Sequence, residues 1–156
     1  MRLFEICLLH KGITMKNESF TNIFDAAEKG TIEDVRYFVE QEKVDVNAID
    51  TRCESQFTAL HHAVAHNSIE MIDDLLSQGA DPKMLTRYGW GLLHLAAQSN
   101  TVQVLEYLVV QGFDVQATTD SGMTLLHVVA SGSPNVEVLK YLVSLGLDPM
   151  AADQEG

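Results

Sequence analysis

The sequence predicts an all-α solenoid of stacked helix-turn-helix units that are joined by β-hairpin loops. The first observation is a fixed period, because His61, His94 and His127 are 33 residues apart, each within a similar string of residues. The second is a helical stripe, in which apolar residues recur at i, i+3, i+6 and i+7 in four places; this spacing defines one face of a helix. A fixed period of roughly 20 to 50 residues is the signature of repeat architectures.

Each unit is predicted to hold a first helix, a turn and the striped helix. The first helix is expected to begin at Thr21, Thr58 or Thr124, whose hydroxyl can cap the first turn, and Gly91 takes this place in the third unit. Gly79, Gly112 and Gly146 follow the last three stripes and suit the left-handed residue that ends a helix. The stripes are Ile32, Val35, Phe38 and Val39; Ile69, Ile72, Leu75 and Leu76; Val102, Leu105, Leu108 and Val109; and Val136, Leu139, Leu142 and Val143.

These strings resemble ankyrin repeats. The family pattern is a TPLH opening, a GAD close and a DxxG hairpin, and it is matched by Leu93-His94-Leu95-Ala96-Ala97, Gly79-Ala80-Asp81 and Asp120-Ser121-Gly122-Met123-Thr124. The resemblance implies antiparallel helix pairs with hairpins projecting at right angles. It also implies that His61, His94 and His127 form hydrogen bonds inside the turn from hairpin to helix. The four units are expected at residues 20–52, 53–85, 86–118 and 119–152.

The first unit and the two ends of the chain depart from this pattern. Phe24 replaces the histidine of the first unit and no glycine closes its second helix, so it is predicted to be an irregular N-terminal cap. The hairpin from Ile49 to Phe57 is three residues longer than its counterparts. Residues 1–19 are expected to be a leader or a degenerate half-repeat, and 153–156 the start of a further hairpin. The last stripe is as apolar as an internal one, which predicts a continuing array or a partner that covers this C-terminal face.

Composition excludes several classes of function. Ten Lys and Arg against 22 Asp and Glu give a net charge of −12, which argues against binding to nucleic acid or to an anionic membrane surface. No apolar run is long enough to cross a bilayer. Cys7 and Cys53 are too few for a disulfide framework, so a cytoplasmic location is expected, with a nuclear protein or a translocated effector as the alternatives left open.

The chain carries no motif of a catalytic nucleophile or of a phosphate-binding loop, so no enzyme, catalytic residue or cofactor is predicted. His62 and His66 are four residues apart on the expected first helix of the second unit, but two imidazoles do not complete a zinc site, and no metal is predicted. Cys53 is interpreted as a surface residue of a variable loop, and Asp73-Asp74 as part of a solvated helix face.

Recognition remains as the predicted function. The resemblance implies a concave surface made of hairpin tips and first helices, on which another protein binds. Trp90, Tyr88 and Arg87 lie together at one tip, and these residue types are enriched at interface hot spots. The acidic surroundings favour a partner with basic groups. The alternative is an ankyrin segment of a larger enzyme or secreted effector whose catalytic domain lies elsewhere. The predicted partner-binding residues are Phe57, His66, Arg87, Tyr88, Trp90 and Met123, with packing between hairpin tips as the competing role.

Overall fold

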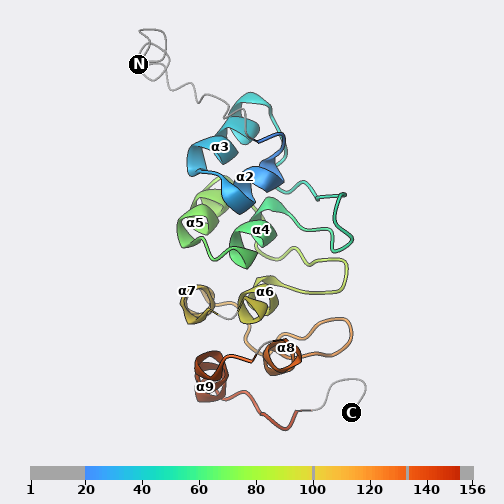
Figure 1. Ribbon diagram of the computed structural model, residues 1–156, viewed down its shortest axis with the longest axis vertical. Coiled ribbons are helices and arrows are strands. Elements are labelled where there is room, and N and C mark those ends of the chain that lie inside the picture. Colours follow the sequence, from blue (N-terminus) through green and yellow to red (C-terminus); the bar gives the residue numbers. More distant parts are fainter. Residues whose placement is uncertain (1–19, 100, 133, 152–156) are drawn as a thin grey trace.

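The fold, given by a computed structural model, is a stack of helix pairs, described for residues 20–99, 101–132 and 134–151. The helix pairs follow one another along the long axis, and the long loops all project to the same side (Figure 1). The predicted all-α solenoid is therefore confirmed, while the expectations for residues 1–19 and 153–156 lie outside the described residues. The helices are α2 (Ile23–Lys29), α3 (Ile32–Arg36), the π-helix η1 (Tyr37–Gln41), α4 (Ala59–Ala65), α5 (Ile69–Ser77), α6 (Leu92–Gln98), α7 (Val102–Val110), α8 (Leu125–Ser131) and α9 (Val136–Ser144).

The core runs through the stack between an inner and an outer row of helices. Helices α2, α4, α6 and α8 form the inner row and contact one another in sequence, and α3, α5, α7 and α9 form the outer row. Leu60, Ile72 and Leu105 are at most 1% exposed in this core. Burial of each such side chain stabilises the fold by about 1.5 to 3 kcal/mol. The stack is thus held by contacts within a unit and between neighbours.

The outer helices bury a wider face than the stripes predict. Two residues after the start of each of the last three stripes, Met71, Val104 and Val138 are at most 3% exposed, although none belongs to a stripe. An outer helix packs against its own inner helix as well as against neighbouring outer helices, so more than one stripe is covered. Val136 and Val143 of the last stripe remain 61% and 45% exposed.

The first helix of each unit begins at a cap that depends on the local residue. Thr58 and Thr124 accept hydrogen bonds from the backbone N–H of His61 and His127, whereas Gly91 begins α6 without a side-chain cap. In the first unit the predicted Thr21 cap is wrong. Asn22 is the cap instead, because its Oδ1 accepts from the N–H of Phe24 at 3.0 Å and of the next residue at 2.9 Å.

The first unit has one additional residue and lacks the closing glycine, and both differences are accommodated in and just after its outer helix. The N–H of Glu42 donates to the carbonyl of Tyr37 at 3.2 Å, so the helix continues as the π-helix η1, whose wider turn accommodates one additional residue. Lys43 then takes φ +57°, where the later units have Gly79 at +92°, Gly112 at +88° and Gly146 at +86°. A lysine in this left-handed region costs about 1 to 2 kcal/mol relative to a helical conformation.

Candidate functional site

The second and third hairpins between units are each closed by a threonine. In the third unit the N–H of Thr86 donates to the carbonyl of Trp90 at 2.9 Å, and the Thr86 hydroxyl accepts from the N–H of Trp90 at 3.1 Å. Thr119 and Met123 repeat this arrangement at 3.0 and 3.2 Å. Each buried threonine therefore fixes the residue that follows its hairpin tip.

Neighbouring hairpins are joined to one another through their backbones. The N–H of Arg87 donates to the carbonyl of Ser55 at 2.9 Å, and the N–H of Asp120 donates to the carbonyl of Tyr88 at 3.3 Å. These bonds connect the first hairpin, which contains Ser55, to the second, and the second to the third. Each hairpin tip is thus held in register with the next along the face that the loops form in Figure 1.

A hollow of about 400 Å³ lies between three of these hairpins and the inner helix α6. Its aromatic lining comes from Phe57, Tyr88 and Trp90, and Leu95 of α6 also lines it. Tyr88 is 49% exposed, while Phe57 and Trp90 are partly buried against the core. The polar side chains at the hollow are Ser55, Thr86, Gln98 and Ser121.

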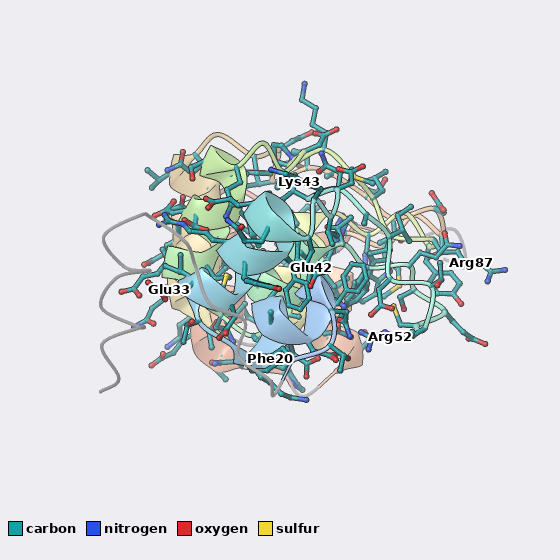
Figure 2. All side chains as sticks on the ribbon, turned by 90° about the horizontal axis from the view of Figure 1, so that it is seen from above. Phe20, Glu33, Glu42, Lys43, Arg52 and Arg87 are labelled. Atoms are coloured by element: carbon teal, nitrogen blue, oxygen red, sulfur yellow. The ribbon has the colours of Figure 1, made fainter. Side chains whose placement is uncertain are left out.

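The structure brings three of the six predicted partner-binding residues together and places the other three outside the hollow. Arg87 is exposed, at the hairpin side of the stack as seen from above (Figure 2). His66 lies at the end of α4, with its Nε2 3.4 Å from a Glu28 carboxylate oxygen. Met123 packs partly buried against the core, as Phe57 and Trp90 do, but it is not among the residues that line the hollow.

Sequence reasoning missed Thr86 and Leu95 as residues of the hollow. Leu95 belongs to the recurrent string on α6, where the pattern indicated only core packing. The distance of four residues between Thr86 and Trp90 was the signal for the first, because a hydroxyl that accepts from the N–H four residues later closes a short hairpin.

The recurrent histidines lie at the junction between hairpin and helix. The Nδ1 of His61 accepts from the N–H of Thr58 at 3.1 Å, and its Nε2 lies 3.1 Å from the carbonyl of Met84 in the next hairpin. Nδ1 of His94 accepts in the same way from Gly91 at 3.2 Å, and Nδ1 of His127 from Thr124 at 3.1 Å. Burial lowers the pKa of His61 to about 4, because a charged ring would lose its hydration there.

A second hollow, of about 430 Å³, lies beside the base of the same hairpins and is mainly apolar. Leu85, Phe113 and the start of α6 with His94 line it. None of the predicted partner-binding residues lines it.

Arg52 organises a cluster of charged side chains where the first hairpin meets α2. Its guanidinium donates to both carboxylate oxygens of Asp50, at 2.9 and 2.8 Å, and to Asp25 at 3.1 Å. These bonds hold the pKa of the Asp50 and Asp25 carboxyls below their ordinary values. The Arg52 guanidinium also lies 5.7 Å from the ring centre of Phe24, within the range of a cation-π contact.

Three possible metal ligands meet beside this cluster. The carboxylate of Asp50, the thiol of Cys53 and the imidazole of His62 offer ligand atoms that all lie within 4.8 Å of one another. Cys53 is half-buried on the hairpin, with its Sγ 3.5 Å from the carbonyl of Asp50. The long hairpin thus brings Asp50 and Cys53 beside His62 of α4.

The interpretation of Asp73-Asp74 as a solvated face is also wrong for its second member. The Asp74 side chain is 4% exposed and accepts from Nε of Arg36 in the preceding unit at 2.9 Å. Its other oxygen accepts from the side-chain amide of Gln78. Asp74 is therefore a polar contact between outer helices, since Arg36 belongs to α3 and Asp74 to α5.

The comparisons with known proteins agree with this architecture. A family model described as ankyrin repeats in three copies matches residues 3–86 and 60–153. Alpha-latrocrustotoxin-Lt1a of Latrodectus tredecimguttatus is 42% identical to this chain over 59 residues, and alpha-latroinsectotoxin-Lt1a of the same spider is 41% identical over 59 residues. Each match covers 38% of this chain but 4% of the toxin, so the chain matches only a small part of either relative.

Proposed function

Because this chain belongs to the ankyrin-repeat family, whose members are generally protein-interaction modules, we propose that it binds a partner protein at the hollow lined by Phe57, Tyr88 and Trp90. The observation that carries the proposal is this hollow on the hairpin face, because an open aromatic pocket with a few polar groups suits an inserted apolar side chain. Tyr and Trp supply large contact areas at a small cost in side-chain entropy.

Rigidity of the hairpins supports this site. The backbone bonds from Arg87 to Ser55 and from Asp120 to Tyr88 join the three hairpins that line the hollow, so they are already ordered before a partner binds. A surface that is already ordered loses little conformational entropy on association. Little of the favourable free energy of a contact at Trp90 is then offset by the entropy of ordering the hairpins, so most of it contributes to the binding affinity.

Charge favours a partner that carries basic groups around its apolar anchor. The chain has a net charge of −12, and Glu54 and Asp120 are exposed on the hairpins whose tips line or flank the hollow. Opposite charges outside the contact centre accelerate encounter and make the association rate depend on salt. We therefore expect binding to slow as the ionic strength rises.

Replacing Trp90 by Ala tests this proposal. We expect the variant to lose about 2 kcal/mol of binding free energy, or roughly 30-fold in affinity, because it removes the largest aromatic side chain of the hollow. Partners are first captured with the immobilised wild-type chain, identified by mass spectrometry, and then measured against wild type and variant by calorimetry.

Tyrosine variants provide a matched comparison. Tyr88→Ala changes a half-exposed residue of the hollow, whereas Tyr37→Ala makes the same change in η1, the outer helix of the first unit. The first should weaken binding and the second should not. If Trp90→Ala lowers the melting temperature while leaving affinity intact, the aromatic row only packs the hairpins and this site is refuted.

The remaining features of this proposal concern the whole chain. We regard the module as non-catalytic and cytoplasmic in its site of action. The exposed Val136 and Val143 on α9 favour a further repeat or a partner against the C-terminal face. In the described residues, no helix is both long enough and apolar enough to cross a membrane.

A second candidate follows from the relatives. Both toxins contain the matching stretch as 4% of their length, which favours the reading of this chain as an ankyrin segment of a longer effector. Sequencing the gene on both sides of this segment tests the second candidate, because a fused catalytic or toxin region would appear directly in the coding sequence.

A further inference from the structure

We propose that Asp50, Cys53 and His62 form a zinc-binding site that ties the long first hairpin to helix α4. The three side chains supply the oxygen, sulfur and nitrogen donors that zinc accepts, and they leave a fourth position for water. This site is separate from the hollow proposed for protein binding.

The hydrogen bonds of Asp50 leave one acceptor position free at the right place. Its Oδ1 already accepts from the backbone N–H of Arg52 and from Nε of the same residue, both at 2.9 Å. Its Oδ2 accepts from the Arg52 guanidinium at 2.8 Å and lies 3.4 Å from Nε2 of His62. Since each carboxylate oxygen can accept about two bonds, Oδ2 keeps one lone pair, and His62 lies beside this oxygen.

His62 is the donor whose environment most needs an ion. Its Nε2 is shielded from water and has no hydrogen-bond partner among the described residues. The side chain is 12% exposed, between the rings of Phe24 and Phe57 at centre distances of 6.0 and 5.3 Å. The nearest acceptor to Nε2 is the Asp50 carboxylate oxygen 3.4 Å away, which satisfies a buried nitrogen poorly, and a metal bond would satisfy it.

The outer surroundings suit a bound cation as well. Nδ1 of His62 lies 4.0 Å from a Glu28 carboxylate oxygen, which is beyond hydrogen-bond distance but places an outer carboxylate beside the imidazole. The backbone N–H of Phe57 donates to Sγ of Cys53 at 3.5 Å and holds the sulfur beside the hairpin backbone. With one thiolate and one carboxylate, the ion's two positive charges are neutralised, so Arg52 can remain on Asp50.

The sequence spacing explains why, in the part of the chain that the structure describes, the site occurs in this unit and not in the others. Two residues separate Asp50 from Cys53, and eight separate Cys53 from His62. Two ligands with a short spacer on a loop, followed by a histidine, are typical of small zinc sites. The three residues added to this hairpin carry the thiol back towards α4. Tetrahedral zinc bonds place donor atoms roughly 3.3 to 3.8 Å apart, so a rotation of Cys53 from the present spread of 4.8 Å closes the set.

Cobalt titration of the reduced full-length chain tests the proposal. Co²⁺ should bind one to one and give a thiolate-to-cobalt charge-transfer band together with the intense visible bands of four-coordinate cobalt, and Zn²⁺ should remove both. Cys53→Ser and His62→Gln should abolish the charge-transfer band or weaken cobalt binding at least tenfold. Cys7→Ser removes the other cysteine of the chain and His66→Gln the neighbouring histidine, and both controls should keep the wild-type spectrum.

Thermal unfolding with zinc gives a second measurement that does not depend on the absorption bands of cobalt. Saturating zinc should raise the melting temperature of the wild type and of Cys7→Ser, but not that of Cys53→Ser or of the alternative Cys53→Ala. Absence of the thiolate band in the reduced wild type, or its persistence in Cys53→Ser, would refute the site. A spectrum that is lost in His66→Gln and kept in Cys53→Ser would assign the ion to the His62 and His66 pair instead, and would equally overturn the proposal.

Discussion

Lowering the pH from 7 to 5 should cost this fold about 2 kcal/mol through His61 alone. The ring is 1% exposed, and its burial lowers the pKa to about 4. In the unfolded chain the same ring has its ordinary pKa near 6.5. Because the folded pKa lies below the unfolded value, stability is complete above about pH 6.5 and declines as the unfolded state takes up a proton that the folded state does not. The loss reaches about 3 kcal/mol below pH 4.

Urea unfolding of wild type and His61→Gln at pH 7 and pH 5 measures this contribution. The variant starts from a lower stability, since it loses the bonds to Thr58 and Met84, but its decrease between the two pH values should be smaller by about 2 kcal/mol. His66→Gln removes a half-exposed ring and controls for the loss of a histidine as such. Equal decreases in wild type and His61→Gln would refute the assignment, as would an NMR titration of His61 with a midpoint near 6.5.

Two further predictions concern the first unit and its contact with the second. Lys43→Gly should raise the free energy of unfolding by about 0.5 to 1 kcal/mol, because φ is +57° there and glycine adopts this conformation without strain; an unchanged urea midpoint would contradict this reading. Asp74→Asn should lower the free energy of unfolding by about 1 kcal/mol, since an amide cannot accept from Arg36 and Gln78 as the carboxylate does, with the half-exposed Arg36 limiting the loss. Glu70→Gln on the same helix removes one exposed charge and should leave urea unfolding nearly unchanged.

The architecture could be predicted from the sequence because each repeat unit carries the same pattern independently. Four stripes, three histidines and three glycines all report one unit, so errors at single positions do not alter the result. Tyr88, Trp90 and Phe57 could also be grouped in advance, since equivalent positions of neighbouring hairpins must lie side by side in a stack.

Features that occur in one unit only were not predictable in this way. An additional residue can form a π-turn or lengthen a loop, and packing against the neighbouring helices decides between them. The residues near Tyr37 do not specify this packing by themselves. The burial of Asp74 depends on Arg36, which is 38 positions earlier in the chain. The meeting of Asp50, Cys53 and His62 likewise requires the path of an irregular hairpin, for which the periodic pattern offers no template.

The π-helix Tyr37–Gln41 shows how a repeat protein can tolerate a change of length. The additional residue is accommodated inside an outer helix, so Val35 and Phe38 stay buried. The burial pattern of the repeat is restored by Val46, which is also buried. Evolution can therefore insert single residues on the convex side without shifting the hairpins opposite. The length of the chain and the shape of the stack are to that extent uncoupled, because the π-turn takes up the added residue within the helix.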